Sequence, residues 1–186
     1  TNSTTNTWST SLLNKTNLNT NFITNIGTEW ANKIATTTWK VGGNTDANIM
    51  NVVPAITYQN EIVNPVTTNT TDNATEYPAK IGLMYASDYG FAADPSAWTK
   101  TLDNYDQRVN GSTIKSLNWM YMGGYNEWPI SRNSSDASIM FLVNASGFVN
   151  NAYASYAYVV RPSFNLESSV TYVSGSGSAD DPIRIG

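Results

Sequence analysis

The chain has 186 residues, a net charge of -4 and only 13% charged residues, and it contains neither histidine nor cysteine. Disulfides, zinc–thiolate sites and catalysis by a thiolate or an imidazole are therefore excluded, and without a basic cluster the chain is not expected to bind nucleic acid. No apolar run approaches the roughly 20 residues that span a bilayer, so this segment is not expected to insert into a membrane.

The N-terminal part is expected to form short helices, then a strand and a long loop. "TNSTTNT", residues 1–7, is polar and low in complexity, which predicts a disordered or linker lead-in. Apolar residues recur at spacings of three and four between 12 and 34, a pattern of short helices that Gly27 interrupts. "ATTTWKVGG" predicts a strand, and residues 44–79 predict a loop that contains one strand, Val52–Ile62.

The centre and the C-terminal part are expected to be mainly β-structure. "KIGLMYASDYGFAA" predicts a buried strand, Ile81–Tyr85, and a short helix that ends near Phe91. "DASIMFLVNASGFVN" predicts a hairpin that turns at Gly147, and its alternation places Met140 on the opposite face from Phe141. "AYVVRPSFNL" predicts a further strand, and "VTYVSGSGSADDPIRI" predicts two short strands around a Gly/Ser loop.

Blocks spread over most of the chain resemble a known family. They are "WSTSLLNKTNLNTNFITNIG", "IGLMYASDYGFA", "WMYMGGYNEWPISR" and "FLVNASGFVNNAYASYAYVVRPSFNL". In this order they resemble a bacterial surface-protein domain of C-type-lectin fold, in its formylglycine-generating-enzyme-like, disulfide-poor form. The most specific element is the closing pattern of Trp128, Ile130-Ser131-Arg132, Gly147 and Val160–Phe164, although Val159 stands where the family has glycine. The resemblance implies an α+β, C-type-lectin-like fold with short N-terminal helices, a small twisted antiparallel sheet and long irregular loops.

The resemblance implies a fold but not the chemical activity of any member of that fold. Enzymes of this fold hold copper with cysteine pairs, which this chain lacks, and its calcium-dependent sugar-binding members use Glu-Pro-Asn or Gln-Pro-Asp, neither of which is present. No spacing among Asp88, Asp103, Asp106 and Glu127 indicates hydrolysis by paired carboxylates. We therefore expect a protein that is not an enzyme and that needs no cofactor.

The fold also resembles the variable proteins of diversity-generating retroelements, in which scattered codons near the C-terminal end are randomised on a constant scaffold. Over 132–158, small polar and aromatic residues alternate with apolar anchors, and Tyr, Trp, Ser and Asn are the residues that binding loops favour. The predicted ligand-binding residues are Tyr121, Tyr125, Trp128, Arg132, Asn133, Ser135, Asp136, Ser138, Met140, Asn144, Ser146, Phe148, Asn150, Tyr153, Ser155, Tyr156 and Tyr158. Trp128 and Tyr158 are equally compatible with core positions, and Arg132 with support of a loop.

Two further features concern charged residues outside this set. Arg161 lies in a predicted core strand and is expected to pair with Asp88 or Glu127, because an unpaired buried charge costs several kcal/mol. Asp180 and Asp181 stand beside small residues and predict either a tight turn or a calcium site.

The sequence as a whole predicts one domain over 8–186 that binds a protein or glycan ligand on another cell or host. An Asn-rich, lysine-poor and cysteine-free chain favours an extracellular or cell-surface location. The alternative is the structural head domain of a pilus or surface-layer subunit, for which a large self-association patch is expected. A glycan site would instead place one or two aromatic rings beside polar groups.

Overall fold

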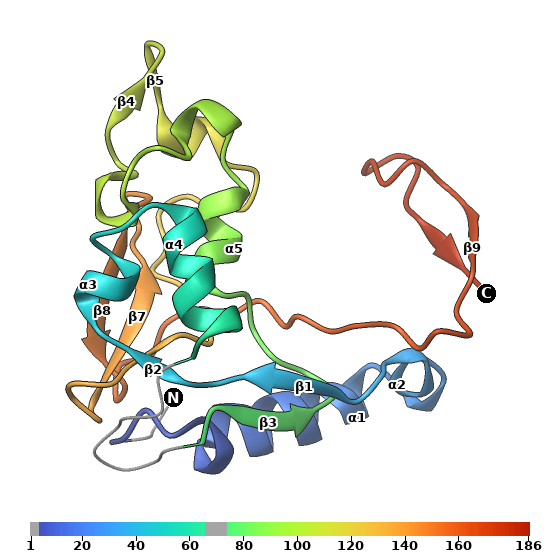
Figure 1. The fold of residues 1–186 in the computed structure, drawn as a ribbon. Coiled ribbons are helices and arrows are strands. Elements are labelled where there is room, and N and C mark those ends of the chain that lie inside the picture. The colour runs from blue at the N-terminus through green and yellow to red at the C-terminus, as the bar shows by residue number, and fades with distance from the viewer. Residues whose placement is uncertain (1–3, 66–73) are drawn as a thin grey trace.

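The computed structural model describes residues 4–65 and 74–186 and shows an α+β fold of short helices and small sheets (Figure 1). The α-helices are α1 (Ile23–Asn25), α2 (Thr28–Lys33), α3 (Asp46–Ile49), α4 (Pro54–Tyr58) and α5 (Ala86–Phe91). The π-helical and 3-10 segments are η1 (Trp8–Thr10), η2 (Leu13–Phe22), η3 (Gln59–Val63), η4 (Pro95–Ala97), η5 (Leu102–Asn104) and η6 (Ile114–Leu117). The strands are β1 (Thr37–Lys40), β2 (Gly43–Asn44), β3 (Glu76–Ala79), β4 (Arg108–Val109), β5 (Ser112–Thr113), β6 (Arg132–Asn133), β7 (Ile139–Val143), β8 (Val149–Tyr153), β9 (Tyr172–Ser174) and β10 (Arg184–Ile185). The predicted α+β class is confirmed.

The central sheet has the strand order β2-β6-β7-β8. The β7–β8 hairpin is antiparallel and turns at Gly147, whose φ is 100°, as predicted. β2 and β6 run parallel, so the prediction of an antiparallel sheet is wrong at this edge. The close approach of these strands needs Gly43, because a Cβ there would lie 2.9 Å from the Cβ of Ser134.

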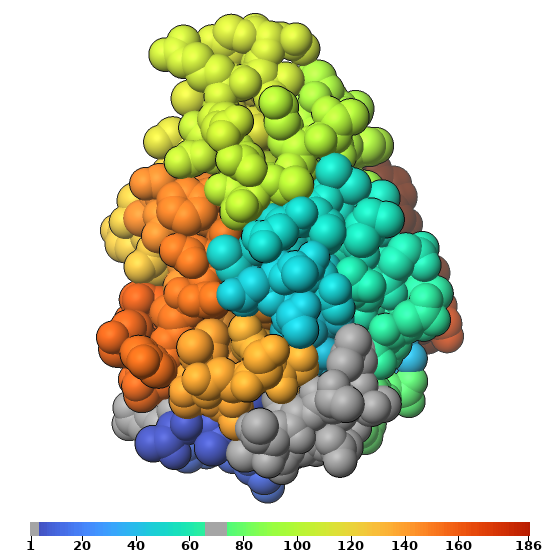
Figure 2. Space-filling model, turned by 60° about the vertical axis from the view of Figure 1, so that its left-hand side comes forward, coloured from blue at the N-terminus to red at the C-terminus, as the bar shows by residue number. Residues whose placement is uncertain are grey.

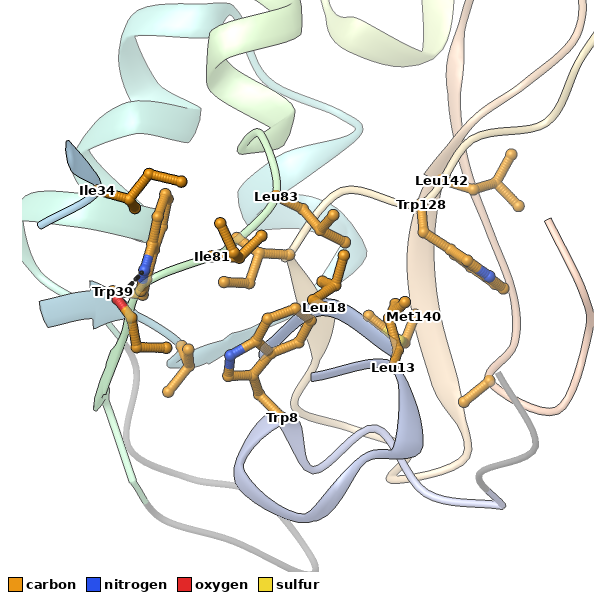
Figure 3. Packing of buried hydrophobic residues seen from close by; sticks show 14 residues of the cluster. Trp8, Leu13, Leu18, Ile34, Trp39, Ile81, Leu83, Trp128, Met140 and Leu142 are labelled. Atoms are coloured by element: carbon orange, nitrogen blue, oxygen red, sulfur yellow. Dashed lines mark hydrogen bonds between the residues drawn. The ribbon is translucent and has the colours of Figure 1, made fainter. Parts of the chain in front are cut away.

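Both faces of β7 are buried, which explains why its sequence, IMFLV, is continuously apolar. Phe141 and Val143 belong to one hydrophobic cluster, which Tyr89 and other residues complete. Met140 and Leu142 belong to a second cluster, in which Figure 3 shows Met140 beside Leu13 of the N-terminal segments and Leu142 beside Trp128. The alternation of the two faces was predicted correctly, but the prediction that Met140 lies at the surface is wrong because the N-terminal segments cover that face.

The N-terminal segments pack as short helices that Gly27, with a φ of 83°, separates as predicted. The predicted lead-in over 1–7 is wrong for Asn6 and Thr7, which are buried. Asn6 Nδ2 donates hydrogen bonds to the backbone oxygens of Asn133 and Ile139, each at 2.7 Å. The polar side chain therefore holds the loop before β7, and residues 1–3 lie outside the described residues.

Three predicted strands are absent from the described residues. Val52–Ile62 forms α4 and η3 instead, because Pro54 at the first helical turn and the inward-facing Thr57 allow a helix there. Ile81–Tyr85 and the "AYVVRPSFNL" segment are extended, but they make only isolated bridges, such as the one between Gly82 and Ser163. Both segments lie against the core without joining the central sheet.

The C-terminal residues form an arm that leaves the body of the protein and ends in the β9–β10 hairpin (Figure 1). Its last anchor is the hydrogen bond from Glu167 N to Lys33 O, at 2.8 Å. Asp181 closes the Gly/Ser loop by accepting hydrogen bonds from the Ser176 backbone, which is the tight turn that the sequence predicts. Within 4–65 and 74–186, no helix is long and apolar enough to cross a bilayer.

Candidate functional site

A hollow of about 400 Å³ lies along the β7–β8 hairpin and the segment that follows β8. Its lining residues are Asn126, Ile139, Leu142, Asn144, Asn150, Asn151, Ala152, Tyr153, Tyr156 and Tyr158. We call it the tyrosine hollow. Its walls combine phenol rings with carboxamides and carry no charged side chain, so it is suited to an uncharged ligand with an apolar surface and hydrogen-bonding groups.

A row of four aromatic rings connects the tyrosine hollow to the core. The ring centroids of Trp128 and Tyr158 lie 4.8 Å apart, those of Tyr158 and Tyr156 6.0 Å, and those of Tyr156 and Tyr153 5.9 Å. Trp128 is buried, whereas Tyr153 is 54% exposed and Tyr156 48% exposed. The buried tryptophan therefore supports the inner tyrosine, and the outer two present ring surface to solvent.

Three asparagines of the hollow have side chains held by the same kind of contact. The Oδ1 atoms of Asn126, Asn144 and Asn150 accept backbone hydrogen bonds from Ala145, Ser146 and Asn151, each at 2.8 Å. Because a backbone N–H requires an acceptor, these bonds fix which end of each carboxamide is oxygen. The three Nδ2 groups have no partner within 4–65 and 74–186, so the hollow offers preoriented hydrogen-bond donors.

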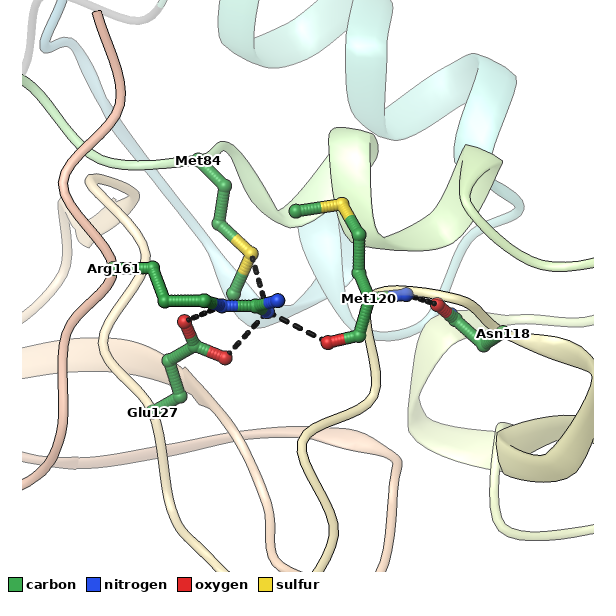
Figure 4. Close-up of polar contacts among 5 residues, drawn as sticks. All are labelled: Met84, Asn118, Met120, Glu127 and Arg161. Atoms are coloured by element: carbon green, nitrogen blue, oxygen red, sulfur yellow. Dashed lines mark hydrogen bonds and ion pairs between the residues drawn. The ribbon is translucent and has the colours of Figure 1, made fainter. Parts of the chain in front are cut away.

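An ion pair between Arg161 and Glu127 joins the segment that carries Trp128 to the segment that carries Tyr158. Arg161 Nε lies 2.6 Å from Glu127 Oε1, and Arg161 Nη2 donates to Glu127 Oε2 at 2.8 Å and to Met120 O at 2.6 Å (Figure 4). The Glu127 side chain is buried and its backbone bridges Val143 and Val159. The predicted pairing of Arg161 is confirmed, with Glu127 as the partner, and it fixes the chain on which Trp128 stands.

The structure brings five of the predicted ligand-binding residues together in the tyrosine hollow. These are Asn144, Asn150, Tyr153, Tyr156 and Tyr158. Ser135, Asp136, Ser146 and Ser155 are exposed elsewhere on the hairpin and its loops, and Tyr125 is 60% exposed, but none of them lines the hollow. Hydrogen bonds from the side chain and backbone of Ser138 lower the pKa of Asp136, so these two residues form a local turn. A binding role for all these residues stays a prediction.

Four residues of the predicted surface are instead buried. Trp128 and Met140 belong to the core cluster around Trp8 and Leu13. Arg132 is buried and donates to Ala74 O at 2.9 Å, and the buried Asn133 donates to Asp46 Oδ1 at 2.9 Å. The prediction of surface positions is wrong for Asn133 and Met140, because α3 and the N-terminal segments cover them, whereas the burial of Trp128 and Arg132 agrees with the alternative roles in the core and in loop support.

Two aromatic members of the predicted set are only partly buried. Phe148 packs against the core cluster of Phe141, which weakens its expected role as an exposed anchor. Tyr121 packs against the same cluster and donates its hydroxyl to Ala145 O at 2.5 Å. Tyr121 therefore supports the β7–β8 turn, Phe148 lies within that turn, and neither residue lines the hollow.

Sequence reasoning missed Asn126 and Asn151 as lining residues. Asn151 lies on β8, where its Nδ2 donates to both carboxylate oxygens of Asp46 at 3.2 Å. In Figure 2 the orange atoms of the β7–β8 region accordingly lie beside the cyan atoms of α3. The position of Asn151 next to Asn150 in the sequence could have indicated that it lines the hollow. No sequence signal indicated Asn126, because its place in the wall depends on the β-bridges that the adjacent Glu127 makes to Val143 and Val159.

A second surface, on the helical side, is rich in larger apolar rings. Two hollows of about 470 and 370 Å³ share Asp88 and Ser163 in their walls, which makes them neighbours. The rings around them are Tyr58, Phe91, Trp98, Trp119 and Phe164, and we call this surface the aromatic face. Phe91 lies 6.5 Å from Tyr58 and 5.3 Å from Trp98, measured between ring centroids, so the rings form a continuous patch.

A buried carboxyl group lies close to this face. Burial raises the pKa of Glu61 to about 7, an effect that the hydrogen bonds from Ser131 and Ser87 partly offset. Ser87 N donates to Glu61 Oε2 at 3.0 Å, and the Ser131 hydroxyl, which donates to Glu61 Oε1, accepts from Ala86 N at 3.1 Å. Glu61 thus ties η3 to the start of α5. Burial also raises the pKa of the neighbouring Asp88.

No family model, curated protein or solved structure matches the chain. Within 4–65 and 74–186, no group of three or more Asp and Glu side chains is arranged to hold a metal ion. Of the two surfaces described above, the tyrosine hollow contains the larger share of the predicted binding residues.

Proposed function

We propose that this chain is a non-catalytic ligand-binding module of adhesin or receptor type, which presents the tyrosine hollow to a protein or glycan ligand outside the cell. The observation that carries the proposal is the combination of two exposed tyrosines with three carboxamides whose donors are preoriented. Tyrosine contributes a large contact area at low entropic cost, and fixed donors reduce the cost of ordering the site.

The relation to C-type-lectin-like folds and to retroelement-diversified proteins belongs to the same proposal. It is supported by the position of Asn144, Asn150, Tyr153 and Tyr156, which line a hollow on a scaffold whose strands are anchored in the core. Side chains at such positions can change without disturbing packing. Diversification would spare the buried residues Asn133 and Met140, so the variable set is smaller than the sequence alone predicts.

The proposal is tested by selecting binders and then removing one ring. A printed array of uncharged oligosaccharides and a phage-displayed peptide library are the two probes, and the best binder of each is measured against Tyr156→Ser. Loss of one well-packed aromatic anchor should weaken binding at least about tenfold. The matched control is Tyr172→Ser, which removes an exposed tyrosine of the β9–β10 hairpin, outside the hollow and outside the predicted ligand-binding residues, and should leave affinity unchanged.

The outcomes separate the ligand classes. An oligosaccharide whose binding disappears with Tyr156 alone identifies a glycan site, whereas a peptide that loses affinity in steps with Tyr153, Tyr156 and Asn150 identifies a broad protein-binding surface. If no probe binds, or if every binder tolerates Tyr156→Ser, the hollow is not the binding site and the proposal fails.

The alternative, a structural head domain, is favoured by one observation. The exposed rings of the aromatic face lie next to one another instead of being scattered singly over the surface. Contiguous exposed apolar patches often mark sites of protein contact. Assembly of purified protein into long regular polymers would support this function over ligand binding.

A further inference from the structure

We infer that the C-terminal hairpin of one copy of this chain packs on the aromatic face of a second copy. The inference concerns an interaction surface and does not depend on the ligand of the tyrosine hollow. It rests on two apolar surfaces of the same chain that both lie open.

The first open surface is the β9–β10 hairpin. Tyr172, Val173 and Ile183 are 66%, 61% and 51% exposed. Every hydrogen bond of the described residues after Glu167 stays within 167–186, and Figure 1 shows the hairpin standing clear of α4 and α5. A lone two-stranded hairpin is at best marginally stable in water, so it needs another surface to pack on.

The second open surface is the aromatic face. Trp119 is 80% exposed, and Tyr58, Phe91, Trp98 and Phe164 each expose between 37% and 42% of their surface. Covering ring surface of this kind lowers the free energy, because apolar surface leaves water. The hairpin, with a tyrosine and two aliphatic side chains, offers a similarly apolar surface to cover it.

The amount of surface fits a pair of copies. From the usual area of aromatic and aliphatic side chains, the aromatic face and the hairpin together expose on the order of 800 Å² of apolar surface per copy. A two-fold exchange buries both surfaces twice, or roughly 1,600 Å², which is the size of a standard stable interface. One hairpin covering its own face would bury only half of that, and the extended arm holds the hairpin away from the body.

The chain leaves the body at a defined point, which allows such an exchange. Leu166 bridges Ile34, and Ala35 N donates to Asn165 O at 2.9 Å, so the base of the arm is fixed on the N-terminal segments. Beyond Glu167 the described residues make no further hydrogen bond to the body. An anchored base followed by an unattached hairpin is the arrangement in which an arm reaches a neighbouring copy.

The test measures the association of the full chain by sedimentation equilibrium. Wild type should form a dimer, and Val173→Asp on the hairpin or Trp119→Asp on the aromatic face should each raise the dimer dissociation constant at least about tenfold, because each places a charge in an apolar contact. Leu12→Asp is the control, since it makes the same change at an exposed apolar residue of the N-terminal segment.

Mixing the two variants decides between exchange and closure within one chain. A Trp119→Asp copy retains its hairpin and a Val173→Asp copy retains its aromatic face, so a one-to-one mixture should associate more tightly than either variant alone. Wild type that stays monomeric up to roughly 100 μM, variants that dimerise like wild type, or a mixture no tighter than its components would each overturn the inference.

Discussion

The tyrosine hollow and the aromatic face are both rich in exposed rings, yet they differ in chemistry. The hollow sets tyrosines beside asparagines, whereas the aromatic face groups mainly phenylalanine and tryptophan rings with Tyr58, in walls that also contain Asp88. A phenol next to a carboxamide can stay hydrated until a ligand arrives, while covering phenylalanine and tryptophan rings removes more apolar surface from water and so favours a lasting contact. Exposed aromatic residues therefore indicate a contact, and their polar neighbours indicate whether that contact is reversible.

The Arg161–Glu127 ion pair lies between the two surfaces, so breaking it should affect both. Arg161→Met leaves a buried carboxylate without its partner, and we expect the free energy of unfolding to fall by about 3 kcal/mol. Chemical denaturation measures this loss. Binding at the hollow should weaken as well, because Glu127 holds the chain that carries Trp128.

The double variant Arg161→Met/Glu127→Gln is the control for this prediction. It removes the unpaired charge while keeping the volume of the buried side chain, so it should recover more than half of the lost stability. A double variant as unstable as Arg161→Met would show that the guanidinium acts mainly through its bond to Met120 O.

The helical side, unlike the tyrosine hollow, contains a group whose ionisation should make the stability of the protein depend on pH. This group is the buried carboxyl of Glu61. The folded protein holds the Glu61 proton up to a pH of about 7, whereas the unfolded chain releases it near pH 4.5. Since the folded state binds more protons between these values, the stability that this group contributes is complete below about pH 4.5 and is lost as the pH rises through about 7. Asp88 shifts in the same direction.

Glu61→Gln should therefore raise the free energy of unfolding at pH 8 by roughly 2 kcal/mol and change it little at pH 4.5. Thermal unfolding at several pH values measures the effect, and Glu29→Gln on the exposed side of α2 is the matched control. Equal stabilisation at both pH values would mean that the Glu61 carboxyl does not titrate between them.

The sequence predicts those parts of the fold that depend on neighbouring residues, but not the burial of a segment by residues far away in the chain. The β7–β8 hairpin, the turn at Gly147 and the C-terminal strands follow from local patterns, because alternation and glycine act within a few residues. The burial of Asn133 and Met140 could not be predicted in the same way, because it depends on Asn6 and the N-terminal segments, which are more than a hundred residues away in the chain.

The candidate site shows the same division. Tyr153 and Tyr156 could be predicted because one ends a strand and the other follows it at surface spacing, and the structure places both in the hollow. The partner of Arg161 required a choice between two acids that only the fold resolves. The Val52–Ile62 segment was misread because its β-branched residues favour a strand locally, whereas packing of α4 against α5 favours a helix.

The smallest expected effect concerns salt, and it separates the two surfaces directly. None of the residues that line the hollow is charged, so the dissociation constant of a selected ligand should change less than about threefold between roughly 50 and 500 mM sodium chloride. Association through the aromatic face should respond in a different way, becoming tighter in sulfate, which strengthens apolar burial. Parallel titrations by calorimetry and sedimentation measure both responses. A ligand that binds tenfold more weakly in high salt would point to the charged loop around Asp136, and the hollow would then be only part of the binding surface.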